Sequence, residues 1–248
     1  SWPIQKIFLA DGITYIVAMI LIYYIRYIPT VKNIISKEKI SVRLREGITY
    51  LKQRPLLFYF GNASYTVFIF TLISVHLLWP VYIENHLSEL GDTYAITKVN
   101  YAIGALFAGF FISIIFRKVN IVASIISMML LAFSCYVLLA FSQSKILLFV
   151  FALGIGLSNA GIRIQRVTFL FNHIPNHIIG RTNSVFQSIN ILLRSLFIGL
   201  FSIPFFAEGS NILWTFVIAA FMVLVSLIPL IYKYKALRDI KKETSTSD

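Results

Sequence analysis

Four polar side chains recur at helical spacing inside a long apolar stretch: Asn183, Gln187, Asn190 and Arg194. Spacings of four, three and four place them on one stripe of an α-helix, roughly 60° wide. The other faces of this helix, predicted over 182–206, carry Phe, Ile and Leu. A charge at bilayer depth is costly unless it faces a wet cavity or a partner. The stripe therefore predicts the wall of an aqueous pathway through a membrane.

Arg194 is the charged member of this stripe and lies near the middle of the predicted span. By helical rise it is about 15 Å from either interface, which is too far for easy snorkelling. An anionic or zwitterionic group on a substrate would suit it as a partner. A structural hydrogen bond to a neighbouring helix is the alternative role for the same side chain.

The span predicted over 57–83 carries further polar candidates on one face, namely Asn62, Tyr65, Thr66 and His76. We interpret the first three as candidates for the substrate pathway, with packing as the alternative for the tyrosine. Histidine titrates near neutral pH, so His76 is a candidate for proton coupling. A histidine that is hydrogen-bonded near the outer interface is the alternative.

Two other predicted spans contain one candidate each. Asn159 lies near the end of the span over 146–162, and Arg163 and Arg166, which follow it, are interpreted mainly as anchors at the inner interface. Asp11 is a carboxylate inside the first predicted span. A buried acid pairs with a base or takes up a proton. Asp11 is thus a second candidate for proton coupling, with helix packing as its alternative role.

The composition is that of an integral membrane protein. Hydrophobic residues make up 58% of the chain and charged residues 13%, with a mean hydropathy of +0.81, whereas soluble domains carry about 25% charged residues. The one cysteine, Cys135, lies in an apolar run, so neither a disulfide framework nor a thiolate metal site is expected. We expect no metal and no cofactor.

A bilayer crossing needs about 20 apolar residues. The sequence contains seven such stretches, which cover residues 4–25, 57–83, 99–116, 121–141, 146–162, 182–206 and 210–232. Eighteen of the 22 lysine and arginine residues fall in the connecting segments on one side of these spans. By the positive-inside rule this side, with the C-terminus, is cytoplasmic, and residue 1 lies outside. The net charge of +12 is therefore a topology signal and does not indicate nucleic-acid binding.

The connector after the first span is long and basic. Within it, Ile40, Leu44, Ile48 and Leu51 recur at helical spacing between Arg and Lys residues, which predicts an amphipathic helix on the inner leaflet. A solvated linker is the alternative. The sequence thus divides into a first helix, this linker, a six-helix bundle and a cytoplasmic tail, over 1–27, 28–56, 57–232 and 233–248.

The six later spans fall into two sets of three that enter from opposite sides, which is the topology of an inverted repeat. This order of elements resembles the second half of a major facilitator superfamily transporter. The family's loop motif has a similar pattern at residues 104–109, with Gly104 and Gly109, followed by Arg117 and Lys118, although its acidic residue is absent here.

Three segments look like parts of the drug and siderophore exporter branch of that superfamily, which holds macrolide-efflux and enterobactin-exporter-like proteins. Residues 44–55 resemble the stretch before its seventh helix, residues 174–185 the stretch before its eleventh, and Asp11 to Tyr15 the start of its sixth. The first span here would then be the last helix of an N-terminal half that this chain lacks.

The resemblance implies an all-α membrane fold of seven transmembrane helices, the last six forming a 3+3 inverted-repeat bundle. It also implies proton-driven efflux of small amphiphilic molecules by alternating access, in the bacterial plasma membrane. The expected partners are the lipid bilayer, a small-molecule substrate, protons and the missing N-terminal half. In this superfamily the helices equivalent to 57–83, 99–116, 146–162 and 182–206 line the central cavity.

Other classes fit the sequence less well. A retinal protein needs a Schiff-base lysine in its last span, and residues 210–232 contain none. An enzyme is disfavoured because no HExxH or GxSxG motif occurs and no pair of intramembrane aspartates is present. A seven-helix receptor, a channel and a non-transporting membrane protein remain as alternatives, and so does a half-size transporter that works as a homodimer.

Overall fold

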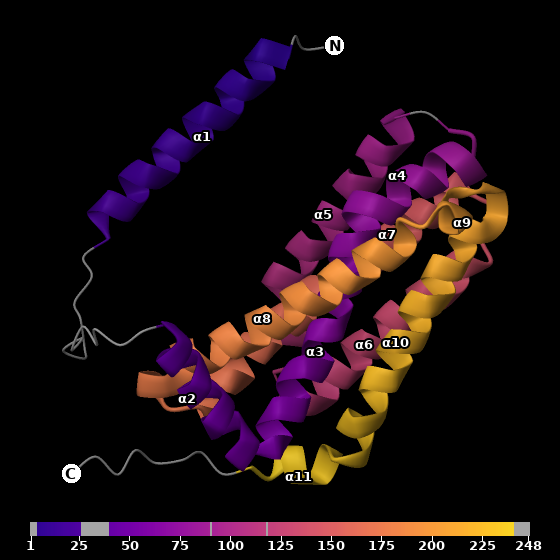
Figure 1. Ribbon diagram of the computed structural model, residues 1–248. Helices are drawn as coiled ribbons and strands as arrows, with labels where there is room; N and C mark the ends of the chain where they lie inside the picture. Colours follow the sequence, from indigo (N-terminus) through magenta and orange to yellow (C-terminus); the bar gives the residue numbers. More distant parts are fainter. Residues whose placement is uncertain (1–3, 26–39, 90, 118, 241–248) are drawn as a thin grey trace, which may run out of the picture. The chain divides into compact units, whose positions relative to one another are not determined.

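The computed structural model describes residues 4–25, 40–89, 91–117 and 119–240 (Figure 1). The chain divides into two compact units, 1–39 and 40–248, which we treat separately. In the first unit, residues Ile4–Tyr24 form helix α1. Its apolar stretch, Phe8–Tyr24, lies at the short end of the range for a membrane crossing, about 17–25 residues.

The described part of the second unit contains helices and no strand. Its first long helical run consists of α3 (Pro55–Ile73), a π-helical turn (Ser74–Leu78), α4 (Trp79–Val81) and a second π-helical turn (Tyr82–His86). The other long helices are α5 (Gly91–Ile115), α6 (Ile121–Ala140), α7 (Lys145–His173), α8 (Asn176–Phe201) and α10 (Ile212–Tyr232). The short ones are α2 (Ile40–Gln53), α9 (Pro204–Ala207), a 3-10 turn (Gly209–Asn211) and α11 (Tyr234–Arg238).

Six of these helical segments are long and apolar enough to cross a membrane, and they correspond to the last six predicted spans. The prediction of seven spans is therefore confirmed for six, and the first predicted span forms α1 with its shorter apolar stretch. Helix α7 packs against α5 and α6, α10 packs against α6 and α3, and α3 also contacts α7 and α8. The inverted-repeat arrangement of the six stays a prediction.

The largest difference from the predicted boundaries concerns α7. The sequence predicts the end of this span at residue 162 and a loop over 163–181, whereas the helix continues to His173 and the next helix begins at Asn176. The prediction of a long loop is wrong because no helix-breaking residue follows until Pro175, which disfavours helix in the residue before it. As a result Arg163 and Arg166 lie on α7 itself.

The helix predicted within the connector forms as α2, and its place on the inner leaflet stays a prediction. Leu51 on its apolar face is buried, and a side chain at Gly47 would meet the backbone carbonyl of Arg181 on α8. The guanidinium of Arg181 forms an ion pair with Glu46. Helix α2 is thus fixed to the start of α8 by a close backbone approach and an ion pair.

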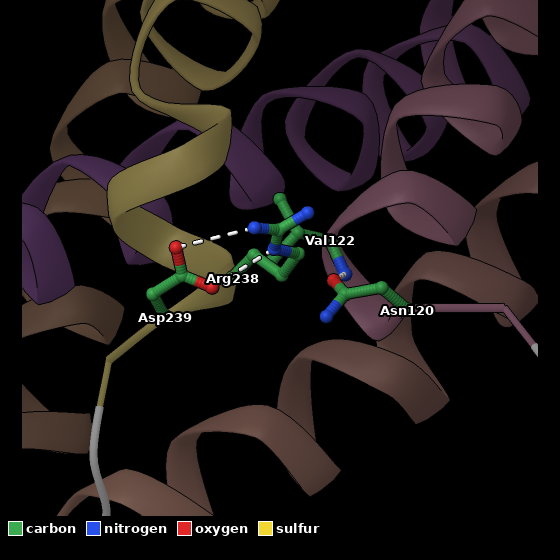
Figure 2. Close-up of polar contacts among 4 residues, drawn as sticks. All are labelled: Asn120, Val122, Arg238 and Asp239. Carbon is green, nitrogen blue, oxygen red and sulfur yellow. Dashed lines mark hydrogen bonds and ion pairs between the residues drawn. The ribbon is translucent and has the colours of Figure 1, made fainter.

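Two of the segments that the charge pattern assigned to one side of the membrane lie at the same end of the bundle. Figure 1 shows α2 and α11 at the end opposite to α4 and α9. Figure 2 shows α11 beside the start of α6, where the side chain of Asn120 accepts a 2.8 Å hydrogen bond from the amide of Val122 and caps the helix. Arg238 and Asp239, at the end of α11, form an ion pair with a nitrogen–oxygen distance of 2.9 Å.

Candidate functional site

The polar stripe of α8 faces α3 at a point where the two helices approach closely. A side chain at Gly61 would overlap the ring of Phe186, so the glycine provides the space into which this phenylalanine packs. The Phe186 ring lies 6.2 Å from the ring of Tyr65, measured between centroids. These contacts set the rotation of α8 and bring the stripe next to Tyr65.

Tyr65 connects α3 to two members of the stripe. Its hydroxyl donates to Oδ1 of Asn183 and accepts from Nε2 of Gln187, each at 3.3 Å. The tyrosine is 5% exposed, whereas both amide residues are exposed. Three predicted pathway residues from two helices therefore meet at one place.

Arg166 of α7 completes this cluster. Its guanidinium carbon lies 3.5 Å from the centroid of the Tyr65 ring, a cation–π contact, and Nη1 donates to the backbone carbonyl of Ser64 at 3.0 Å. The residue is only 4% exposed. We use the name "Tyr65 cluster" for Tyr65, Arg166, Asn183 and Gln187.

The sequence analysis interpreted Arg166 as an interface anchor, and the structure places it inside the bundle. A signal for this was available. Arg166 follows Asn159 by seven residues, which is two helical turns on the same face. The signal was missed because the predicted helix ended before residue 166.

The other two members of the stripe continue along α8 from the Tyr65 cluster. Asn190 is 2% exposed, and its Nδ2 has no acceptor in the described part of the chain. Arg194 is half-buried, and no hydrogen bond or ion pair joins it to another described residue. Both side chains therefore have donors that no described residue satisfies.

The remaining pathway candidates form hydrogen bonds outside the Tyr65 cluster. Asn62 donates to the carbonyl of Phe58 at 2.9 Å, and Thr66 donates to the carbonyl of Asn62 at 3.4 Å, so both are bonded within α3. Asn159 donates to the hydroxyl of Tyr101 on α5 at 2.9 Å. It joins α5 to α7 and does not belong to the Tyr65 cluster.

Helices α5 and α7 are held together by glycines at their contact. A side chain at Gly104 would overlap the carbonyl of Leu153, and one at Gly156 would overlap the carbonyl of Tyr101. Gly109, by contrast, faces open space. Of the predicted loop motif, Gly104 thus lies inside a helix contact, Arg117 is exposed after the end of α5, and Lys118 lies outside the described residues.

The two candidates for proton coupling lie away from this cluster or in the other unit. His76 is exposed on the π-helical turn Ser74–Leu78, a kind of irregularity that is frequent at functional sites. Asp11 belongs to α1, where its backbone carbonyl accepts a 2.7 Å hydrogen bond from the hydroxyl of Thr14. Their roles stay predictions.

A groove of about 610 Å³ also opens between α2, α3 and α8. Its lining is mostly apolar and includes Leu44, Phe58 and Leu192, and it contains no member of the polar stripe. Among the described residues no cluster of three or more histidine, cysteine or acidic residues is arranged to bind a metal.

Comparison with known proteins adds one match. A family model described as Major Facilitator Superfamily matches residues 1–197. No curated protein and no solved structure matches the chain.

Proposed function

The chain belongs to the major facilitator superfamily and is a membrane transporter, and on this premise we propose that it exports small amphiphilic molecules in exchange for protons by alternating access. The observation that carries the proposal is the meeting of the α8 stripe with Tyr65. Polar side chains from two helices meet there and form one polar wall of the bundle.

This wall has the properties that a transport pathway needs. Asn183 and Gln187 are exposed, so they are accessible to water and to a substrate. Exposed apolar side chains of the same helix, such as Ile191 and Ile198, favour an amphiphilic ligand because apolar linings with a few polar groups bind such molecules. A second six-helix half would supply the opposite wall, in line with the resemblance to the second half of such a transporter.

The direction and the coupling ion rest on the resemblance to the drug and siderophore exporter branch. Within the described residues, His76 and Asp11 are the titratable groups that we propose for proton coupling. Replacement of either coupling residue, His76→Gln or Asp11→Asn, would then abolish proton-driven accumulation and leave exchange of substrate across the membrane intact. Normal accumulation by both variants would remove these residues from the mechanism.

The test is transport by the full-length transporter in proteoliposomes with a pH-sensitive dye inside. A panel of amphiphilic drugs and siderophores is added, and substrate-dependent proton flux is recorded for the wild type, for Arg194→Ala and for Arg163→Ala. The second variant is a matched control because Arg163 is exposed on α7 and lies outside the stripe. We expect flux in the wild type and the control, and none in Arg194→Ala at equal protein abundance.

Two results would contradict the proposal. If folded protein moves no compound and no protons, the chain is not a proton-coupled exporter. If Arg194→Ala transports normally, the stripe is not the pathway and its polar groups serve helix packing.

A further inference from the structure

The membrane-spanning helices around the α8 stripe carry several basic residues but almost no acidic ones. Residues 93–207 contain no Asp or Glu, yet they contain eight Lys or Arg residues. Helix α10 contains no acidic residue either, and the helical run over 55–86 has only Glu84, within its last turn. The positive charges of Arg166 and Arg194 therefore have no carboxylate from the six membrane-spanning helices near them in depth.

This absence of a carboxylate partner distinguishes Arg166 and Arg194 from Arg181. Arg181, at the start of α8, is paired with Glu46 of α2. Arg166 contacts Tyr65 and one backbone carbonyl, has no carboxylate partner among the described residues, and is almost fully buried. Two positive charges in a low-dielectric region without a counter-charge are energetically unfavourable, because burial removes the water that would otherwise stabilise them.

The side chains of the same region also have surplus N–H donors. Nε of Arg166 and Nδ2 of Asn190 are buried and have no acceptor in the described part of the chain. Nε2 of Gln187 donates to a tyrosine hydroxyl, and the Arg194 guanidinium adds five further N–H donors. A group that is rich in acceptors and carries negative charge would satisfy the donors of Asn190 and Arg194, and its charge would offset that of Arg166.

From this arrangement we propose that the wall binds an organic anion, so that the transported substrate carries a carboxylate or a group of equivalent charge. Arg194 and Asn190 contact the anionic group, and Arg166 is a positioning residue that supplies a fixed positive charge from behind the Tyr65 ring. This inference rests on the proposed function, since it names the substrate class of the same site. A cationic amphiphile would be repelled by both arginines.

The first test compares three forms of one ligand: an aromatic carboxylate, its methyl ester and the primary amine of the same skeleton. Their binding to the full-length protein in detergent is measured as a shift in thermal unfolding temperature, and their transport is measured in proteoliposomes. A hydrogen bond to a charged group is worth enough to make the carboxylate bind about tenfold or more tighter than the ester. We expect no stabilisation by the amine.

The second test uses variants. Arg194→Gln is expected to abolish the preference for the carboxylate over the ester, whereas Arg194→Lys keeps the charge and keeps the preference in weaker form. Arg166→Gln is expected to weaken carboxylate binding and to leave ester binding unchanged. Arg163→Gln, an exposed arginine on the same helix, is the control and is expected to bind like the wild type.

The outcomes separate this inference from the proposed function. Proton flux driven by esters or amines as readily as by carboxylates would support the transporter and overturn the anion site. Stabilisation by carboxylates alone, without proton flux, would support the anion site and overturn the proposed coupling. An unchanged carboxylate preference in folded Arg194→Gln would mean that another part of the protein neutralises the arginine, and it would overturn the inference even if Arg166→Gln does not fold.

Discussion

The contact between α5 and α7 and the contact between α3 and α8 use different means of joining two membrane helices. At the first, Gly104 and Gly156 let the two backbones approach until no side chain fits between them. A side-chain hydrogen bond from Asn159 to Tyr101 accompanies this contact. At the second, one glycine, Gly61, makes room for a phenylalanine, and polar side chains occupy the surface beside it.

The difference shows how one bundle can combine a rigid helix contact with a ligand-binding surface. Close backbone packing gains van der Waals contact in a medium where the hydrophobic effect between helices is absent. Polar groups at a membrane helix contact are stabilising only if each finds a partner. At α5–α7 Asn159 is bonded to Tyr101, whereas on α8 Nδ2 of Asn190 has no acceptor among the described residues. We therefore assign stability to the first contact and ligand binding to the second.

We expect the largest loss of stability when the α5–α7 contact is broken. Gly104→Ala would push a methyl group into the carbonyl of Leu153, which requires a backbone shift and costs about 1–3 kcal/mol of folding free energy. Gly109→Ala on the same helix meets nothing and is expected to be neutral. Thermal unfolding in detergent and abundance in the membrane check this pair. Equal unfolding temperatures for the two variants would refute the assignment.

The next largest effect is expected at Tyr65, where two variants distinguish the role of the ring from the role of the hydroxyl. Tyr65→Leu removes the ring beneath the buried Arg166 and is expected to cost about 2 kcal/mol, the value of a desolvated cation–π contact. Tyr65→Phe keeps the ring and loses the hydroxyl bonds to Asn183 and Gln187, each worth about 0.6 kcal/mol in a membrane. We expect Tyr65→Phe to reduce transport more than stability. If both variants unfold at the same temperature, the ring does not support Arg166.

A smaller effect is expected at the polar pair of the α5–α7 contact. Tyr101→Phe leaves Nδ2 of Asn159 without its acceptor and should destabilise the protein by about 0.6 kcal/mol. Transport rates and ligand preference should stay at wild-type values, since this pair lies outside the proposed pathway. A double-mutant cycle with Asn159→Ala measures the coupling. A change in ligand preference would show that the two contacts are not functionally separate.

The smallest effect concerns the far end of the α5–α7 pair, outside the membrane-spanning segments. Nζ of Lys145 lies 2.7 Å from Oε1 of Glu89, and this hydrogen-bonded pair lowers the pKa of the glutamate below its ordinary value of 4.5. A lowered pKa means that the pair stabilises the fold fully above about pH 4.5 and that this stabilisation is lost as the pH falls through the folded-state pKa.

The pair is exposed, so its contribution is small and falls with salt. Glu89→Gln is expected to unfold with a weaker dependence on pH below 4.5 than the wild type at low ionic strength. Unfolding temperatures of the two proteins between pH 3 and pH 6, at two salt concentrations, measure the difference. Parallel curves would show that the pair contributes nothing.

The sequence by itself determined the membrane class, six of the spans and the helical nature of the linker segment that forms α2. These follow from hydropathy and periodicity, which are local properties that any bilayer-spanning fold must satisfy. The stripe of Asn183, Gln187, Asn190 and Arg194 could also be predicted, because side chains at these spacings share a face on any α-helix.

Only the tertiary structure decided which residues meet that face. The pairing of Tyr65 with two amides of α8 depends on how close α3 and α8 approach, and Gly61 and Phe186 set that distance. The position of Arg166 depends on the length of α7 and on its contact with α3, neither of which hydropathy determines. Sequence periodicity tells which side chains share a helix face, but the packing of other helices decides whether that face is buried, paired or open to a ligand.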